Sequence, residues 1–374
     1  MRGTRISLIV VVLFLVVGTV APATVAGAGK TAHQETPEAS IVADEPNCSF
    51  PLTETDASGT EVTLEDEPET VVTLNPSAAQ TLWEIGAEEK VIGTTKHAMN
   101  LDGAEDRTNV STEAETIEPE IVVDLDPDLV LAPSSNYVSE ETVETLREAG
   151  VTVYYFQSAE SIDEVRERTL FVGSLVGECD GAEETVDWMD AELEAVADAI
   201  DGEERPDVLY TFFGHTAGED TFIHELIEAG GGTNVAAEAG ISEYPQISDE
   251  TVIEQDPDWI VLNTNSPEVP DGPAYESTTA IENDQTLVVD INHLNRPGPR
   301  VVHAVTAFAE TFHPEAYAEA TGDEPSESAN GSTADDGTGG ADGVPGFGAL
   351  SAVVGLCITL FVAHRTIRHG DERS

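Results

Sequence analysis

Basic residues are scarce in this chain of 374 residues. There are 15 lysines and arginines against 73 aspartates and glutamates, which gives a formal net charge of -58. The only lysines are Lys30, Lys90 and Lys96. Such a chain would repel the phosphates of a nucleic acid, so nucleic acid is excluded as a partner.

Intrinsic disorder is disfavoured because 40% of the residues are apolar and occur in periodic blocks. Evenly spread carboxylates instead fit a folded, halophilic protein that works in molar salt, where charge repulsion is screened.

Cysteine is equally scarce, with three residues in the chain. Cys357 lies in an apolar C-terminal stretch and cannot serve the folded domain. In an exported chain the other two, Cys48 and Cys179, are expected to form a disulfide that ties the N-terminal segment to the middle of the chain. Two free buried thiols are the alternative.

Common catalytic and cofactor motifs are absent from the sequence. It contains no Gly-x-Ser-x-Gly elbow, no glycine-rich phosphate loop with its lysine and no dinucleotide fingerprint. With Cys48 and Cys179 assigned to a disulfide, no cysteine nucleophile stands out. Paired carboxylates carry no information in a chain with 73 acidic residues. The sequence therefore predicts a protein that is not an enzyme and has no cofactor.

Histidines are the remaining hint of a metal site. The segment His224-Glu225-Leu226-Ile227-Glu228 is close to the zinc-protease motif, but glutamate replaces the second histidine. An incidental histidine on a surface helix is the simpler interpretation. Four more histidines, which could converge on a zinc or manganese cleft although their spacing does not require it, are His97, His215, His293 and His303. We predict no metal site, and a surface metalloenzyme stays as a competing hypothesis.

The N-terminus carries an export signal. Residues 1–28 begin with two arginines, continue with an apolar run from Ile6 to Val20 and end in small residues. This pattern is typical of a secretory signal peptide, with cleavage after Ala28. Three Asn-x-Ser triplets suit an exported glycoprotein, at Asn47, Asn109 and Asn330.

The C-terminus carries a second targeting signal. Residues 319–344 form an acidic linker rich in Gly, Ser and Thr. Residues 345–374 follow, with an apolar stretch from Gly348 to Ala363 and a basic tail that we expect in the cytoplasm. The folded part is therefore predicted to be tethered to the outer face of the cytoplasmic membrane.

A repeated segment is the most informative feature that is present. Residues 126–131, Asp-Pro-Asp-Leu-Val-Leu, recur at 256–262 as Asp-Pro-Asp-Trp-Ile-Val-Leu. In both copies a helix-like approach stops at the proline, and an apolar run of strand length follows. Continuous apolar strands indicate a parallel sheet covered by helices on both faces. Two such units predict two similar lobes with a ligand cleft between them.

The remaining pattern completes an α/β fold of two Rossmann-like lobes. Residues 29–67 are an N-terminal segment with a hairpin, and residues 68–160 alternate strands with short helices as the first lobe. Residues 161–204 have helical spacing, with a break near Gly177, and are expected to be a long, rigid helical connector. Residues 205–318 form the second α/β lobe. Residues 100–115 are expected to be a poorly structured acidic loop.

Several short motifs, taken in order, resemble one family. They are Asn75-Pro76-Ser77 leading to Ile85-Gly86-Ala87, then Leu125 to Val130, Gly231 to Val235, and the closing segment Arg300 to Glu315. This order is similar to the substrate-binding proteins of ABC importers whose two lobes are joined by one rigid helix and which handle cobalamin, iron-siderophores and haem. Pro345-Gly346-Phe347 before the apolar stretch resembles the archaeal PGF-CTERM anchoring signal, which implies a cleaved and lipidated span. A retained transmembrane anchor is the alternative.

The resemblance also implies ligand contacts. Tyr244-Pro245-Gln246-Ile247-Ser248 looks like the segment of cobalamin-binding members whose leading aromatic lies at the ligand, so Tyr244 is the first candidate. An ordinary loop aromatic is the alternative. In open parallel sheets ligands meet the loops at the carboxyl ends of strands. That rule adds nine residues, namely Asn75, His97, Ser135, Asn136, Tyr137, Phe213, His215, Asn263 and Asn265.

The resemblance implies partners as well. Family members carry one carboxylate in each lobe that pairs with arginines of the membrane permease. Glu225 or Glu228 fits that role in the second lobe, whereas the first lobe has Gln80 at the matching position and Glu84 one turn later. The expected partners are a permease with its ATPase, and the protein is expected to be a monomer. The lead ligand is cobalamin, with a ferric siderophore or haem as the alternative, and an adhesion or cell-envelope protein is the hypothesis outside this class.

Overall fold

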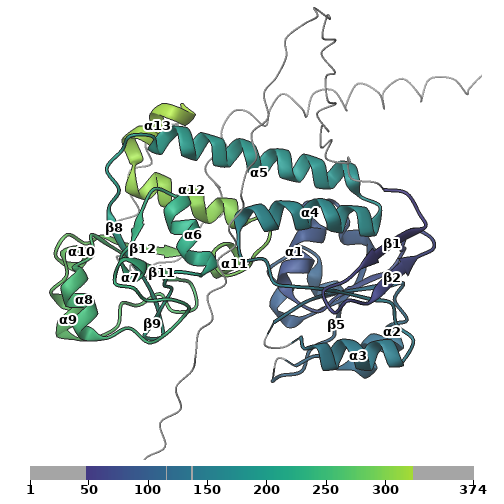
Figure 1. The fold of residues 1–374 in the computed structure, drawn as a ribbon. Coiled ribbons are helices and arrows are strands. Elements are labelled where there is room, and N and C mark those ends of the chain that lie inside the picture. The colour runs from purple at the N-terminus through teal and green to yellow at the C-terminus, as the bar shows by residue number, and fades with distance from the viewer. Residues whose placement is uncertain (1–47, 115, 136–137, 323–374) are drawn as a thin grey trace, which may run out of the picture. The chain divides into compact units, whose positions relative to one another are not determined.

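The computed structural model describes residues 48–114, 116–135 and 138–322 (Figure 1). It begins with an antiparallel hairpin of β1 (Leu52–Thr55) and β2 (Glu61–Leu64), in which Leu52 pairs with Leu64. The disulfide Cys48–Cys179 joins this N-terminal part to a helix in the middle of the chain, with the two Cα atoms 5.9 Å apart. This is the pairing that the sequence analysis predicted.

The N-terminal lobe contains a five-stranded parallel sheet in the order β5-β4-β3-β6-β7. Its strands are β3 (Val71–Thr73), β4 (Val91–Thr94), β5 (Thr108–Asn109), β6 (Leu129–Pro133) and β7 (Val153–Phe156). Its helices are α1 (Pro76–Glu84), α2 (Pro119–Leu125) and α3 (Glu140–Glu148), with 3-10 turns η1 (Glu88–Lys90), η2 (Lys96–Ala98) and η3 (Ala104–Asp106). The prediction of a poorly structured loop at residues 100–115 was wrong, because η3 and the edge strand β5 form there and β5 pairs with β4.

The C-terminal lobe contains a second sheet in the order β10-β8-β11-β12, with β9 paired antiparallel to β8. Its strands are β8 (Asp207–Phe212), β9 (His215–Thr216), β10 (Thr233–Asn234), β11 (Trp259–Asn263) and β12 (Thr286–Val289). Its helices are α6 (Phe222–Ala229), α7 (Val235–Glu238), α8 (Asp249–Gln255), α9 (Pro273–Glu276), α10 (Thr279–Glu282), α11 (Ile291–Leu294), α12 (Val301–Phe312) and α13 (Pro314–Thr321). Helix α13 runs past residue 319, so the predicted start of the linker was too early.

Two helices connect the lobes. They are α4 (Ile162–Val176) and α5 (Cys179–Ile200), which lie side by side in Figure 1. Gly177 ends α4 in the left-handed region, at φ 79°, and this is the break that the sequence predicted. Helix α5 contacts α1 of the first lobe and α6, α12 and α13 of the second. A single 22-residue helix therefore packs against both lobes.

The repeated segment has the same structural role in both lobes. Asp126 and Asp256 end α2 and α8 in the left-handed region, at φ 48° and 41°, where a short polar side chain is tolerated. The proline that follows cannot continue the helix. The second aspartate then bonds to the backbone at the start of the neighbouring strand. Asp128 accepts the N–H of Thr70, just before β3, at 2.9 Å, and Asp258 accepts the N–H of Asp207, the first residue of β8, at 3.0 Å.

Both sheets are covered on both faces, as the continuous apolar strands indicate. On β6, Leu129 and Leu131 belong to one buried cluster, and Val130 and Ala132 to another. On β11, Val261 belongs to one cluster and its two neighbours belong to a second. The predicted α/β fold with two lobes is therefore confirmed. No helix among the described residues is long and apolar enough to cross a membrane, and the predicted span from Gly348 to Ala363 lies outside them.

Candidate functional site

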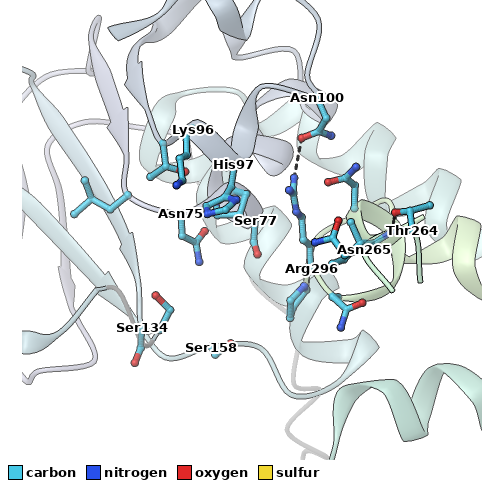
Figure 2. Close-up of a pocket in the computed structure, with 18 residues that line it drawn as sticks. Asn75, Ser77, Lys96, His97, Asn100, Ser134, Ser158, Thr264, Asn265 and Arg296 are labelled. Atoms are coloured by element: carbon cyan, nitrogen blue, oxygen red, sulfur yellow. Dashed lines mark hydrogen bonds between the residues drawn. The ribbon is translucent and has the colours of Figure 1, made fainter. Parts of the chain in front are cut away.

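A cavity of about 690 Å³ lies between loops of the two lobes (Figure 2). Its walls come from the segments that follow β3, β4, β6 and β7 in the first lobe and β11 and β12 in the second. The edge at the carboxyl ends of parallel strands is where open α/β sheets bind ligands. Its lining residues are Leu74, Asn75, Pro76, Ser77, Thr95, Lys96, His97, Asn100, Ser134, Ser135, Ser158, Thr264, Asn265, Ile291, Asn292, Asn295, Arg296 and Pro297.

The chemistry of this cavity differs from that of the chain as a whole. None of its 18 described lining residues is an aspartate or a glutamate, although the chain has 73 of them among 374 residues. Amide and hydroxyl side chains dominate, and Lys96, His97 and Arg296 add positive or ionisable groups. The cavity is therefore suited to a ligand with many neutral hydrogen-bonding groups, or to one with an acidic group. It is poorly suited to a small cation.

Arg296 reaches across from the second lobe to the first. Its Nη1 donates to Asn100 Oδ1 at 2.8 Å, the contact drawn as a dashed line in Figure 2. Burial lowers the pKa of Arg296 to about 10, with Asp290 acting to raise it and Arg300 to lower it further. The guanidinium still carries its charge at neutral pH. Asn100 thus holds a partly desolvated cation at the wall of the cavity.

Helix α1 fixes the two lobes to each other beside the cavity. Gln80 is fully buried, and its Nε2 donates to Asn292 O at 3.0 Å, while its Oε1 accepts the Arg300 N–H at 3.3 Å. Glu84 Oε1 accepts from Arg300 Nε at 2.6 Å. Gly298 comes so close that a Cβ atom there would lie 2.6 Å from Gln80 Oε1. These contacts restrict relative movement of the lobes at this side of the cavity.

Four of the predicted ligand residues line the cavity, namely Asn75, His97, Ser135 and Asn265. Asn75 has a second function, because its Oδ1 accepts the Ala78 N–H at 2.9 Å and caps α1. Asn136 and Tyr137, which were also predicted, lie outside the described residues. All four lining residues come from segments that directly follow strands, as the strand-end rule requires.

Three other predicted residues gather in a separate aromatic cluster, which we define as Phe212, Phe213, His215 and Tyr244. The Phe212 ring centroid lies 6.4 Å from Phe213, 5.8 Å from His215 and 6.5 Å from Tyr244. Phe213 is 70% exposed and has φ 47°, and Tyr244 is 43% exposed. The cluster begins at the carboxyl end of β8 but is not part of the lining described above. It offers exposed aromatic surface at the same edge of the second sheet.

The last predicted ligand residue, Asn263, lies behind the cavity wall. It is buried, its Nδ2 donates to Tyr210 Oη at 2.7 Å, and its Oδ1 accepts the Asn265 N–H at 3.0 Å. Sequence reasoning did not nominate Asn292 and Asn295, which do line the cavity. A signal for them existed, because they follow the apolar run Leu287-Val288-Val289 and the strand-end rule applies there as well.

The predicted docking carboxylates all have partners within the chain. Glu84 pairs with Arg300, as described above. Glu225 accepts the Ile162 N–H at 3.1 Å, and burial raises the pKa of Glu225 despite that hydrogen bond. Glu228 pairs with Arg205 at 3.1 Å. Gln80, at the position where the family pattern has a carboxylate, is buried between the lobes and is not on the surface.

The histidines of the metal hypothesis do not assemble into a metal centre. Within the described part of the chain there is no group of three or more His, Cys, Asp or Glu side chains that could hold an ion. The Nδ1 atom of His224 lies 3.3 Å from the Nδ2 atom of Asn234. The rings of His293 and His303 are 4.9 Å apart, but His97 and His215 belong to the cavity wall and the aromatic cluster.

Residues 71–290 match the periplasmic binding protein family. This chain belongs to that family. Its members are substrate-binding proteins of transporters and are not enzymes, which agrees with the absence of catalytic motifs. The structure of a haem-binding periplasmic protein from Roseiflexus is similar, with a TM-score of 0.60, 26% identity, and coverage of 66% of this chain and 99% of that one.

Two relatives in sequence have names that refer to the binding of cobalamin or of vitamin B12. The cobalamin-binding protein of Halobacterium salinarum is 43% identical over 312 residues, which cover 80% of this chain and 84% of the relative. The vitamin B12-binding protein of Vibrio parahaemolyticus is 25% identical over 260 residues, which cover 67% of this chain and 92% of the relative. The resemblance to a cobalamin and iron-siderophore class of substrate-binding proteins is thereby confirmed.

Proposed function

We propose that this protein is an extracellular cobalamin receptor that delivers its ligand to the permease of an ABC importer. The observation that carries the proposal is the 43% identity to a halobacterial cobalamin-binding protein over 80% of the chain. Identity of this extent spans both lobes and therefore both walls of the cavity.

The chemistry of the cavity supports a corrinoid ligand. A corrinoid has two apolar faces and a rim of amide groups, so it needs neutral donors and acceptors around its edge and apolar or aromatic surface against its faces. Five asparagines line the cavity, at positions 75, 100, 265, 292 and 295. The aromatic cluster supplies exposed rings, with Tyr244 and Phe213 as the candidates for contact with a face of the corrin ring.

A haem or an anionic ferric siderophore is the second candidate. Two observations favour it, namely the structural similarity to a haem-binding protein and the positive or ionisable groups Lys96, His97 and Arg296 at the cavity wall. Carboxylates of such a ligand would pair with these side chains in a partly desolvated site. Cobalamin has no free carboxylate, so direct comparison of the two ligands separates the candidates.

The proposed location is the outer face of the cytoplasmic membrane. Export by a signal peptide at residues 1–28 and anchoring by residues 345–374 both concern segments outside the described residues. The Cys48–Cys179 disulfide supports an exported protein, because disulfides persist outside the cytoplasm. Mass spectrometry of the protein from its native membrane would detect loss of the first 28 residues and either a lipid in place of the C-terminal span or the intact span.

Calorimetric titration with cyanocobalamin in molar potassium chloride tests the ligand. We expect saturation at one ligand per chain, with weaker binding by Asn265→Ala in the cavity and by Tyr244→Ala in the aromatic cluster. Ile253→Ala is the matched control, because Ile253 is exposed but belongs to neither site. Absence of binding by a demonstrably folded protein would rule out cobalamin. Haemin and ferric siderophores would then be titrated in the same way.

Uptake of labelled cyanocobalamin by cells tests delivery. Cells without this protein should lose uptake and regain it with the wild-type chain. Glu225→Gln and Glu228→Gln variants should bind cyanocobalamin normally but restore less uptake if these carboxylates dock on the permease. Full uptake by both variants would remove them as docking residues and leave the receptor function intact.

A further inference from the structure

A buried hydrogen-bond network lies directly behind the cavity wall of the second lobe. Its centre is Tyr210 on β8, which is fully buried. Tyr210 Oη accepts from Asn263 Nδ2 at 2.7 Å and from Asn295 Nδ2 at 3.3 Å. Its own O–H points to Asn295 Oδ1 at 3.5 Å. One phenol thus joins the end of β11 to the end of α11.

The network extends into the cavity wall. Asn263 Oδ1 accepts the N–H of Asn265 at 3.0 Å and the N–H of Ser266 at 3.1 Å. Asn265 and Asn295 line the cavity. Ser266 Oγ in turn accepts the N–H of Phe213 at 3.3 Å, which connects the network to the aromatic cluster.

The hydrogen bonds at its two ends fix which way the Asn263 amide points. An asparagine amide has a donor end and an acceptor end of nearly the same shape, so a hydrogen-bond partner must select between them. The backbone N–H groups of Asn265 and Ser266 can only donate, so they select the Oδ1 end of Asn263. Tyr210 Oη then accepts from the Nδ2 end and holds the amide in this orientation. Burial raises the pKa of Tyr210, although the hydrogen bonds with Asn295 and Asn263 act in the opposite direction. The phenol therefore stays neutral and can both donate and accept.

We propose that Tyr210 is a positioning residue for ligand specificity, whose phenol fixes the amides of Asn263 and Asn295 and through them the cavity wall at Asn265. This inference rests on the proposed function, because it concerns the same ligand cavity. Loss of the phenol oxygen removes the 2.7 Å acceptor of the buried Asn263 amide and leaves it the longer contact with Asn295 Oδ1 at 3.4 Å, which favours rotation of the amide and loosening of the loop.

Tyr210→Phe tests the proposal, and Tyr275→Phe is the matched control. Tyr275 on α9 is also a buried tyrosine, and its side chain lies beside Thr211, the residue next to Tyr210 on β8. It packs in the cluster that contains Leu209, Ile260 and Leu262, whereas Tyr210 packs in the other cluster of this lobe. Both variants lose a buried hydroxyl beside the same strand, but only Tyr210 contacts the cavity wall.

The first readout needs no ligand. Backbone hydrogen exchange at Asn265 should be faster in Tyr210→Phe than in both the wild type and Tyr275→Phe, because the Asn265 N–H donates to Asn263 Oδ1. Exchange at Ser266 should change less, because its N–H also donates to Asn263 O at 2.9 Å. The second readout is affinity for cyanocobalamin, which should fall about tenfold in Tyr210→Phe and remain at the wild-type value in Tyr275→Phe. Asn263→Ala removes the middle of the network and should give the same two results if Tyr210→Phe does not fold.

A double-mutant cycle shows whether Tyr210 acts through Asn295. The loss of affinity in Tyr210→Phe combined with Asn295→Ala should be smaller than the sum of the two single losses in free energy. Additive losses, or equal exchange rates in Tyr210→Phe and Tyr275→Phe, would overturn the positioning role. If the wild type binds no cyanocobalamin, the proposed ligand fails while the exchange comparison still decides between positioning and mere packing.

Discussion

At the scale of single residues, the scarce cations are used to join parts of the chain that are distant in sequence. Arg147 pairs with Asp56 of the hairpin, which is 91 residues away. Lys90 pairs with Glu67, and its Nζ also donates to Val176 O at 2.7 Å, at the C-terminal end of α4. In a chain with 73 acidic residues, these two cations therefore lie where two elements meet.

Asp56 is the clearest single case, because its side chain is fully buried. Burial acts to raise the pKa of Asp56, but hydrogen bonds from Ser58, Arg147, Thr60 and Tyr155 together lower it below its usual 3.8. The stabilisation from this carboxylate is therefore present above pH 3.8 and is lost as the pH falls through the lower folded-state pKa. We predict that Asp56→Asn lowers the free energy of unfolding by about 2 kcal/mol at neutral pH.

Denaturant unfolding in molar salt at neutral and at acidic pH measures this effect. The difference between the wild type and Asp56→Asn should shrink as the pH falls below the folded-state pKa. Asp163→Asn is the control, since Asp163 also pairs with an arginine but its side chain is 80% exposed. An equal loss in both variants would contradict the prediction, because an exposed pair contributes little.

At the scale of elements, helix α5 holds the molecule together through close contact with α1. Gly181 on α5 lies so near the end of α1 that a Cβ atom there would be 2.1 Å from Ile85 O. The disulfide begins the same helix at Cys179. Closely packed helices such as these do not bend easily, and α5 also contacts three helices of the second lobe.

Gly181→Ala tests this packing, because the sign of its effect on the free energy of unfolding depends on how tight the contact is. In an ordinary helix, replacement of glycine by alanine stabilises by about 1 kcal/mol. Here we expect destabilisation, because the backbone of Ile85 cannot move away as a flexible side chain would. Thermal unfolding monitored by circular dichroism measures the change, and an increase in melting temperature would show that the contact is not tight.

At the scale of the whole molecule, the contacts of α5 with both lobes and the bonds of Gln80 and Glu84 to the second lobe oppose hinge motion. We predict only a small change of shape on ligand binding. Small-angle scattering profiles with and without ligand should nearly superpose. A clear decrease in the radius of gyration would contradict this and would place the protein among receptors that close about a hinge.

The net charge of -58 sets the conditions under which the fold is stable. Salt at molar concentration reduces the Debye length to about 3 Å, so it removes most of the self-repulsion of the folded state. We predict that the melting temperature rises steeply with potassium chloride and that the protein unfolds when salt is removed. A melting temperature that does not depend on salt would refute the halophilic interpretation.

The sequence by itself determined the features that depend on neighbouring residues. The Asp-Pro-Asp repeat fixes a helix end, a chain reversal and the start of a buried strand within a few positions, so both lobes could be predicted. The break at Gly177 is equally local. Because parallel strands place their carboxyl ends at one edge, the rule also selected Asn75, His97, Ser135 and Asn265 for the cavity wall.

Only the tertiary structure decided which strand-end residues face the cavity and which support it. Asn263 satisfies the same rule as Asn265, yet Tyr210 and the end of α11 occupy the space beside it and bury it. Gln80 has the sequence position of a surface carboxylate but lies between the lobes. Both outcomes depend on packing between segments far apart in the chain, where the position of a residue within its own element carries no information about the neighbour that covers it.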